Sequence, residues 1–198
     1  MATITAEMVK NLRSTTGAGM MDCKKALAES DGDVDKALDF LRKKGLATAK
    51  KRAGRETKNG VVFSYIHMDK IGVLLEINCE TDFVAKNDDF LDFAKNVAMH
   101  ITATNPLAVT EDEVPAEIVA KEREIYMGQV LEMGKPEAMA SKIVEGKLSK
   151  FLKDNCLLNQ PYVKNPELTI ADLLTETIGK TGENVAIRRF TRYQLGEE

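Results

Sequence analysis

Residues 81–84 combine side chains that suit contact with a partner. Thr81 supplies a hydroxyl, Asp82 a carboxylate and Phe83 an aromatic ring, and Val84 follows. The Thr81 hydroxyl can cap a helix by accepting from backbone amides of its first turn. Asp82 then lies in that turn, where a carboxylate interacts favourably with exposed amides. Such a corner can present an aromatic ring and a carboxylate to a partner. The residues alone favour the alternative, an inward Phe83 with Asp82 as a second capping group, because most large apolar side chains belong to a core.

The other reactive residue types form no recognisable catalytic or metal site. His67 and His100 are too few and too far apart for a zinc motif, so each is expected to be structural. Gly179-Lys180-Thr181 resembles the end of a phosphate-binding loop, but the required first glycine would fall at Leu174, inside a predicted helix. The sequence also lacks the Gly-x-Ser-x-Gly motif of hydrolases. We therefore expect a binding protein, without a metal or cofactor of its own, and not an enzyme.

The elements around residues 81–84 are predicted to be a β-hairpin and a helix. An alternating apolar pattern predicts a strand over residues 71–79 with one buried face, formed by Ile71, Val73, Leu75, Ile77 and Cys79. Residues 61–67 alternate in the same way, so the two strands are expected to pair through a turn near Asp69-Lys70. A helix over residues 88–103 follows, and Asn105-Pro106 ends it. Its inward side chains are expected to be Phe90, Ala94, Val97 and Ile101.

Residues 5–45 predict three short helices with a small shared core. Gly17 and Gly19 are expected to separate the first helix from the second. Asp33 is expected to be the N-cap of the third helix, and Gly45 is expected to end that helix. Cys23, Ala26 and Leu27 form the expected inward stripe of the second helix. Adjacent helical positions point about 100° apart, so one of Met20 and Met21 can be buried and the other is expected to be exposed. An exposed methionine suits an adaptable contact surface.

The pattern of residues 115–153 predicts a helical hairpin with its turn at Gly134-Lys135-Pro136. The hairpin either protrudes from the core or packs fully against it. Ile118, Ile125 and Val130 are expected on the inner side of its first arm. Loop patterns occupy 159–166, a helix is predicted over 169–179, and a closing strand over 183–195, in which a bulge is possible at Arg188-Arg189. The predicted fold class is α+β: a three-helix module, then a small antiparallel sheet flanked by helices and carrying the hairpin.

Charge is unevenly distributed along the 198 residues. Residues 1–58 carry 13 Lys and Arg against eight Asp and Glu, whereas residues 59–198 carry 15 against 23. This asymmetry favours separate modules, which we place at 1–45, a basic linker at 46–60 and a core at 61–198. The linker carries Lys50, Lys51, Arg52, Arg55 and Lys58. It could bind RNA or an acidic partner, but a solvated connection is favoured because no aromatic side chain is interleaved to stack on bases.

The three cysteines, Cys23, Cys79 and Cys156, are far apart in the sequence and form no Cys-x-x-Cys motif. This is typical of reduced thiols in a cytoplasmic protein. No apolar run reaches the roughly 18 residues of a membrane span, and no signal peptide is visible at the N-terminus. We therefore expect cytoplasmic localisation and no membrane partner. The composition also lacks the strongly basic character of a dedicated nucleic-acid-binding domain.

Two long motifs resemble the signatures of the translation elongation factor Ts family. The first is Leu12-Arg13-Ser14-Thr15-Thr16-Gly17-Ala18-Gly19-Met20-Met21-Asp22-Cys23-Lys24-Lys25-Ala26-Leu27, and the second is Glu76-Ile77-Asn78-Cys79-Glu80-Thr81-Asp82-Phe83-Val84-Ala85-Lys86. Their order and spacing also fit, and the resemblance extends through residues 159–163 to the last strand. The chain has one copy of the core that longer family members duplicate, so it resembles the compact members.

The resemblance implies a guanine-nucleotide exchange factor for elongation factor Tu that is not itself a GTPase. Residues 81–84 match the element that disturbs the partner's magnesium site, with Phe83 as a wedge and Asp82 acting either on metal-bound water or on a partner helix. The matching N-terminal contact surface consists of Arg13, Met20, Met21 and Lys24. His100 matches a contact of the core, and the hairpin at 115–153 matches a projecting coiled coil. Compact members can also form homodimers through the core sheet.

An adaptor without exchange activity is the alternative from another functional class. The N-terminal helices resemble ubiquitin-associated domains, and the basic linker could bind RNA in a salt-sensitive manner. This alternative predicts RNA binding through residues 50–58 and no effect on any nucleotide.

Overall fold

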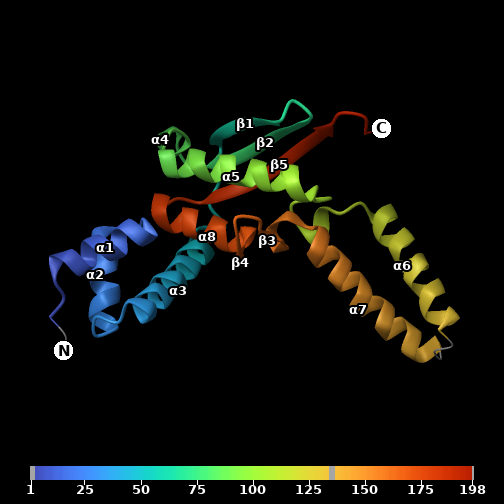
Figure 1. Ribbon diagram of the computed structural model, residues 1–198, viewed down its shortest axis with the longest axis horizontal. Coiled ribbons are helices and arrows are strands. Elements are labelled where there is room, and N and C mark those ends of the chain that lie inside the picture. The colour runs from blue at the N-terminus through green and yellow to red at the C-terminus, as the bar shows by residue number, and fades with distance from the viewer. Residues whose placement is uncertain (1–2, 134–136, 198) are drawn as a thin grey trace. The chain divides into compact units, whose positions relative to one another are not determined.

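The computed structural model describes residues 3–133 and 137–197, and its α+β architecture confirms the predicted fold class (Figure 1). Strands β1, β2 and β5 form one sheet in the order β1-β2-β5, and β3 pairs with β4 in a second, antiparallel sheet. The elements are α1 (Ala6–Thr16), α2 (Met20–Glu29), α3 (Val34–Arg52), β1 (Asn59–His67), β2 (Ile71–Cys79), α4 (Asp82–Ala85), α5 (Asp88–Thr104), η1 (Glu111–Glu113), α6 (Ala116–Glu132), α7 (Glu137–Asn155), η2 (Leu157–Asn159), β3 (Pro161–Tyr162), β4 (Asn165–Thr169), α8 (Ile170–Thr181) and β5 (Val185–Gln194).

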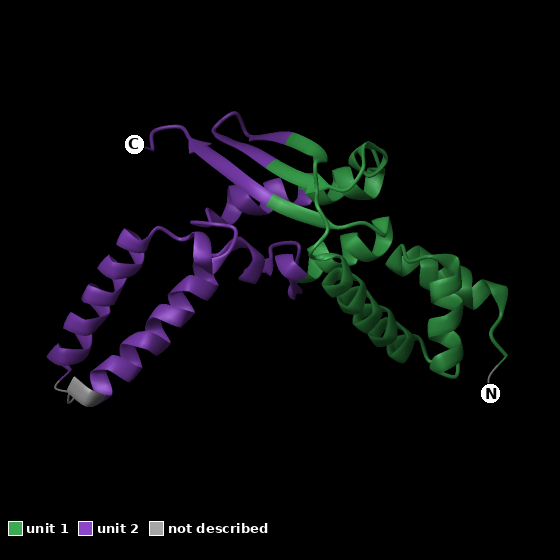
Figure 2. Ribbon diagram, turned by 180° about the vertical axis from the view of Figure 1, so that it is seen from behind, with its two compact units in different colours: residues 1–62, 76–95, 172–187 green, residues 63–75, 96–171, 188–198 purple. Residues whose placement is uncertain are grey.

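The chain divides into two compact units, each built from three segments (Figure 2). Unit 1 comprises residues 1–62, 76–95 and 172–187, and unit 2 comprises residues 63–75, 96–171 and 188–198. The boundary crosses β1, β2, β5, α5 and the start of α8, so each unit contains one end of the sheet and one part of each of these two helices. Each unit is described separately below.

The N-terminal helices of unit 1 have the predicted cap at Asp33, a further cap at Thr5, and the predicted buried stripe of the second helix. The Thr5 hydroxyl accepts from the Met8 amide at 3.2 Å, and the Asp33 carboxylate accepts from the Lys36 amide at 3.1 Å. Gly17 ends α1 in the left-handed region, with φ 66°, and its amide donates to the Arg13 carbonyl. The buried core of these helices consists of Val9, Leu12, Cys23, Ala26, Leu27 and Ala37.

The predicted end of the third helix at Gly45 is wrong, because α3 continues to Arg52. Gly45 instead lies within α3 and packs against α8 at ordinary van der Waals distance: a Cβ at Gly179 would lie 3.8 Å from the Gly45 Cα. Residues 46–52 are mostly good helix formers, and three basic side chains in the last turn interact favourably with the negative end of the helix dipole. The first seven residues of the predicted 46–60 linker are therefore helical.

In unit 1, β1 and β2 approach closely next to residues 81–84. Gly60 has φ 151°, and a Cβ at this position would lie 2.1 Å from the Ile77 carbonyl oxygen. Only glycine fits this approach, because any side chain would collide with the backbone of β2. In β2 the residues Val73, Leu75, Ile77 and Cys79 are all buried, which confirms the predicted alternation.

The helix after the sheet is also as predicted. Its buried side chains include the expected Phe90, Ala94, Val97 and Ile101, together with Phe93 and Ala98. It ends at Thr104, and Asn105 takes a positive φ of 45° ahead of Pro106. The aromatic and apolar stripe therefore continues along the whole of α5.

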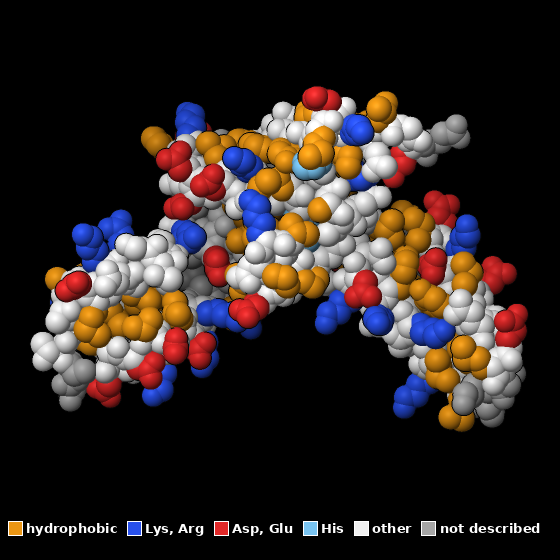
Figure 3. All heavy atoms as spheres, in the orientation of Figure 1, with side chains coloured by type: hydrophobic (Ala, Val, Ile, Leu, Met, Phe, Trp, Pro, Cys, Tyr) orange, Lys and Arg blue, Asp and Glu red, His pale blue; other side chains and the backbone are white. Residues whose placement is uncertain are grey.

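Unit 2 contains the predicted helical hairpin, formed by α6 and α7. The two helices share a buried cluster of Val130, Ala140 and Val144, and hydrophobic side chains alternate with charged ones along the pair (Figure 3). Ile125 is exposed, so its predicted place on the inner side is wrong; Tyr126 and Met127 pack against the cluster instead. The predicted turn at Gly134-Lys135-Pro136 lies outside the described residues.

The segment 159–166 was expected to be a loop and instead contains β3 and the start of β4. These short strands are antiparallel, with Tyr162 opposite Asn165. In β5 the buried positions shift by one at Arg188 and Arg189, where two successive side chains are exposed, as the sequence pattern suggested. Among the described residues, no helix combines the length and apolarity needed to cross a membrane.

Candidate functional site

The corner at residues 81–84, here called the exchange corner, forms the predicted capped turn at the end of β2. Thr81 is in an extended conformation, and its hydroxyl accepts from the Val84 amide at 3.5 Å. The four-residue helix α4 begins at Asp82, so the predicted N-cap is confirmed. Phe83 is 83% exposed, and the inward orientation favoured from residues alone is therefore wrong. The aromatic ring is therefore accessible from solvent at this corner.

Asp82 stands beside Phe83 and is paired with a lysine on the next helical turn. Its carboxylate accepts from the Lys86 ammonium at 3.0 Å, and both side chains are exposed. The hydrogen bond and charge of Lys86 lower the pKa of Asp82 below its ordinary value. Asp82 is therefore ionised at neutral pH and adds a negative charge next to the aromatic ring.

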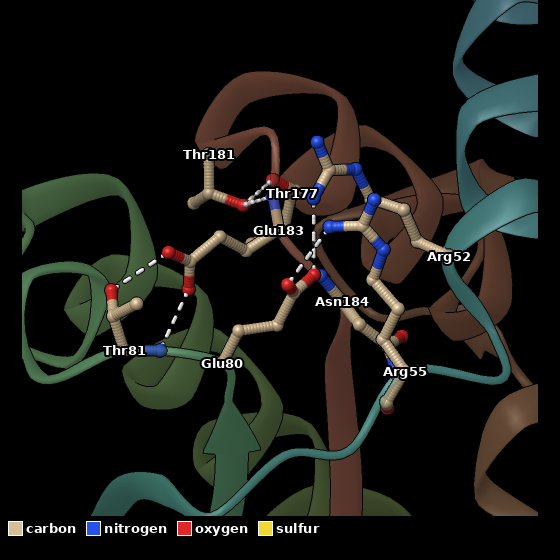
Figure 4. A network of polar contacts seen from close by, with 8 residues as sticks. All are labelled: Arg52, Arg55, Glu80, Thr81, Thr177, Thr181, Glu183 and Asn184. Atoms are coloured by element: carbon tan, nitrogen blue, oxygen red, sulfur yellow. Dashed lines mark hydrogen bonds and ion pairs between the residues drawn. The ribbon is translucent and has the colours of Figure 1, made fainter.

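The base of the exchange corner is held by a polar network within unit 1 (Figure 4). The Glu183 carboxylate accepts from the Thr81 amide at 3.0 Å and from the Thr81 hydroxyl at 2.7 Å. The Glu80 carboxylate accepts from the Asn184 amide at 2.6 Å and from the guanidinium groups of Arg52 and Arg55, each at 3.1 Å. The Asn184 hydrogen bond, followed by the two arginines, lowers the pKa of Glu80.

The N-terminal surface predicted as a second contact region is exposed throughout. Arg13 lies in the last turn of α1, Met20 and Met21 begin α2, and Lys24 follows on the same helix; all four side chains are exposed. Met20 is 47% exposed and Met21 is 73% exposed, so the expected exposed methionine is confirmed and neither of the two belongs to the core. The core of these helices is filled by Cys23, Ala26 and Leu27, which leaves both methionines available to a partner.

His100, predicted as a core contact, is completely buried in unit 2. Its Nε2 donates to the Gln160 Oε1 at 2.9 Å, and its Nδ1 accepts from the Val163 amide at 3.3 Å. Burial lowers the pKa of His100, and the hydrogen bond to Gln160 opposes that shift. The side chain is therefore a neutral part of the core, and any influence on a partner acts through the segment that it holds.

The basic linker is partly used within the protein. Arg52 and Arg55, two of the five basic residues on which the RNA-binding alternative depends, pair with Glu80. Lys58 pairs with Glu56 at the surface. Gly179, Lys180 and Thr181 belong to the last turn of α8, as expected from the rejection of a phosphate-binding loop. Across the described residues, no group of three or more His, Cys, Asp or Glu is arranged to hold a metal ion.

Sequence reasoning did not identify the polar network below the exchange corner. Glu183 and Thr81 are 102 residues apart, and Asn184 and Glu80 are 104 residues apart. No local pattern connects such distant positions. The only available indication was the choice of Thr81 as a cap, which implied that its hydroxyl must be oriented by some partner.

The comparisons with known proteins agree with the motifs and with this geometry. The family described as elongation factor TS matches residues 47–197. Elongation factor Ts of Desulfosudis oleivorans is 61% identical over 198 residues, covering all of both chains. The same factor of Desulfotalea psychrophila is 57% identical over 98% of each chain, and that of Solidesulfovibrio magneticus is 58% identical over the full length of both. This chain belongs to the elongation factor Ts family.

Proposed function

We propose that this chain accelerates GDP release from elongation factor Tu by inserting Phe83 of the exchange corner beside the partner's magnesium and nucleotide site. Elongation factor Ts is a nucleotide exchange factor for elongation factor Tu in translation elongation, and it is not an enzyme. As such a factor, the chain acts in the cytoplasm. The observation that carries the proposal for the site is the 83% exposure of Phe83 on a capped and internally bonded corner.

Phe83 can supply binding energy without any rearrangement of the factor. Transfer of a fully exposed aromatic side chain into an apolar site stabilises a complex by about 2 kcal/mol. The ring is already exposed, and the corner below it is held by hydrogen bonds, so little ordering cost remains at binding. Asp82, ionised beside the ring, adds charge at the same place, either toward metal-bound water or toward a partner helix.

The mechanism requires no covalent step. A bound nucleoside diphosphate is held by backbone amides, a lysine and a metal ion that offsets phosphate charge. A wedge that shifts the groups around the metal weakens this hold on the nucleotide. Linkage then requires reciprocity: a factor that weakens GDP binding by about 150-fold, or about 3 kcal/mol, must itself be weakened equally by GDP.

The remaining predicted contacts divide into direct and indirect ones. Arg13, Met20, Met21 and Lys24 form an exposed surface that can bind the partner's nucleotide domain directly, and methionines suit a contact that must adapt as nucleotide leaves. The buried His100 acts indirectly, by holding Val163, which is 44% exposed. The α6–α7 pair corresponds to the projecting coiled coil of the family and offers a further surface.

The direct test is release of a fluorescent GDP analogue from elongation factor Tu in excess unlabelled GDP. Catalytic acceleration at a molar ratio well below one, dependent on Phe83, is the expected result. An unchanged release rate, with the GTPase shown to respond to another factor of the family, would reject the proposal. RNA mobility shift at physiological salt serves as the parallel test of the adaptor alternative, and we expect no shift.

We further propose that the chain forms a homodimer through the outer face of the core sheet. Within unit 2 this face exposes Ile66, Leu74 and Tyr193, and Ile66 lies over Gly72, with its Cδ1 3.3 Å from where a Cβ of Gly72 would be. Monomers do not usually leave such apolar side chains together in water. Sedimentation equilibrium should give a dimer for the native chain and a monomer for Ile66→Glu. A native chain that stays monomeric at tens of micromolar would exclude this dimer.

A further inference from the structure

We propose that Glu183 is a positioning residue for exchange, and that Glu80 and Glu183 form a reciprocal clasp that holds the exchange corner against the start of β5. This inference rests on the proposed function of Phe83. The reciprocity is in the backbone: Glu183 accepts from the amide of Thr81, which follows Glu80, and Glu80 accepts from the amide of Asn184, which follows Glu183 (Figure 4). Two acidic side chains therefore bind each other's neighbouring amide.

The exchange corner needs such support because little else fixes it. A helix of four residues has no stability of its own, since nucleation of a helix is unfavourable and only later residues compensate for it. Phe83 is too exposed to anchor the corner by packing. Of the residues in α4, only Ala85 is buried. The orientation of Phe83 must therefore come from the residues at the base of the corner.

Glu183 controls the cap itself through the Thr81 hydroxyl. That hydroxyl donates to the Glu183 Oε1 at 2.7 Å, which directs its proton away from α4 and leaves an oxygen lone pair to accept from the Val84 amide. A threonine hydroxyl rotates freely unless it has a fixed acceptor. The charge-assisted hydrogen bond to Glu183 is stronger than a neutral one and so fixes the rotation.

Glu183 is in turn fixed by the end of α8. Gly182 has φ 70°, and its amide donates to the Ile178 carbonyl at 2.9 Å, which turns the chain sharply after the helix. The Glu183 amide donates to the Thr181 hydroxyl at 3.4 Å, and that hydroxyl donates to the Thr177 carbonyl at 2.8 Å. The carboxylate that orients Thr81 therefore extends from a short connection that is hydrogen-bonded to the end of α8, and such support helps to position a site precisely.

A positioning role makes a specific kinetic prediction. The exposed N-terminal surface can still form the encounter complex when the corner is loose, so affinity should change little. Insertion of Phe83 would then carry the ordering cost that the clasp now removes, and the rate at saturating factor should fall. A general loss of fold would lower both parameters together with thermal stability.

The test combines nucleotide exchange kinetics with amide hydrogen exchange on the free protein. Glu183→Gln removes the charge and one of the two acceptors, and Thr81→Val removes the hydroxyl while preserving its shape. Glu56→Gln is the matched control, because Glu56 is an exposed acid of the same unit that forms a surface ion pair with Lys58. Each variant is assayed for GDP release from elongation factor Tu, and protection of the Val84 and Ala85 amides is measured without partner.

For Glu183→Gln we expect an at least tenfold lower rate at saturating factor, a half-saturating concentration within threefold, and at least tenfold faster exchange of the Val84 and Ala85 amides. The double variant should match Thr81→Val alone, since both changes break one unit. Unchanged amide protection would overturn the clasp. Lost protection with an unchanged saturating rate would overturn the positioning role. If native protein fails to accelerate GDP release, the proposed function fails, whereas amide exchange still tests the clasp. Thr81→Val provides the same test if Glu183→Gln does not fold.

Discussion

Two polar networks connect distant parts of the chain, one in each compact unit, and they differ in charge and in burial. In unit 1, Glu80 and Glu183 accept hydrogen bonds from backbone amides about a hundred residues away in the sequence, and the Glu80 side chain is 18% exposed. In unit 2, the neutral imidazole of His100 and the amide of Gln160 are buried and hydrogen-bonded to each other. The first network lies below an exposed aromatic ring, whereas the second lies inside the core.

This difference follows from what each network must support. A charged group can remain near the surface without a large desolvation cost, and its hydrogen bonds are strong enough to hold a corner that has no core of its own. A neutral network inside a core avoids that cost entirely and specifies one arrangement of the surrounding side chains. The comparison indicates that unit 1 uses charge to present a contact residue and unit 2 uses neutral hydrogen bonds to define its fold. The predictions below test that division.

The largest expected effect is that of Phe83→Ala on exchange. We expect the rate of GDP release to fall by about 100-fold, or about 2.7 kcal/mol of transition-state stabilisation. The free energy of unfolding should change by less than about 0.5 kcal/mol, because the ring contacts little of its own chain. Stopped-flow release and urea unfolding measure the two effects. Leu46→Ala, another exposed apolar side chain of unit 1, is the control and should leave exchange unchanged. Near-native exchange by well-folded Phe83→Ala would remove the wedge from the mechanism.

The second prediction places the effect of His100→Ala on stability and not on exchange. Removal of this buried ring leaves a cavity and a Val163 amide without its acceptor, while Gln160 Oε1 keeps only its hydrogen bond from Thr104, so the free energy of unfolding should fall by about 2 kcal/mol. The exchange rate per folded molecule should stay within about threefold. His67→Ala is the control, since that side chain is exposed. A stable His100→Ala protein with strongly reduced affinity for elongation factor Tu would instead show that the Val163 segment, which His100 holds, is part of the partner interface.

Many of the elements that surround the two networks could be predicted from the sequence, because their patterns are local. The cap at Thr81, the alternation of β2 and the buried stripe of α5 each depend on neighbours within a few residues. From the residues alone Phe83 was placed inward, because burial statistics favour it, whereas the family resemblance implied an outward wedge, and the structure leaves the ring exposed. The continuation of α3 past Gly45 was also missed, because the good helix formers that follow outweigh the cost of one interior glycine.

The two networks themselves could not be predicted, because they join segments that no local pattern relates. Glu183 lies in a stretch whose visible features were a helix end and the start of a strand. Gln160 lies in a segment predicted as a loop, which instead forms β3 and holds His100. Long-range hydrogen bonds of this kind depend on how elements meet in space, which the periodicity of each element does not determine.

The third prediction is that the two networks weaken at different pH values. The pKa of His100 is lower in the folded protein than in the unfolded chain, so on acidification the unfolded chain binds a proton at this site before the folded protein does. The stability that neutral His100 contributes is therefore lost as pH falls below the ordinary value near 6.5. Glu80 also has a lowered folded pKa, but here the charged form is the native one, so its contribution persists until pH falls below its ordinary value near 4.5. We therefore expect the protection of unit 2 amides to decline at a higher pH than that of unit 1 amides.

Amide hydrogen exchange between pH 7.5 and 4, corrected for intrinsic rates, measures this order. Glu80→Gln should flatten the acid part of the unit 1 profile and leave the decline of unit 2 near pH 6 in place. Loss of protection in both units at one common pH would contradict the separate roles of the two networks and indicate a single cooperative acid transition.

The smallest expected effect is that of Lys86→Ala, which tests whether the Asp82 carboxylate beside Phe83 needs its ion pair with Lys86 to act in exchange. The Asp82–Lys86 pair is exposed on both sides, so its removal should change the free energy of unfolding by less than about 0.5 kcal/mol. The pKa of Asp82 should rise toward its ordinary value, which still leaves the carboxylate ionised at neutral pH. The GDP release rate should therefore stay within about twofold of native, and Lys58→Ala, which breaks another exposed pair, is the control. A tenfold change specific to Lys86→Ala would show that the partner contacts the pair itself, and the contact surface of unit 1 would then extend along α4 beyond the aromatic ring.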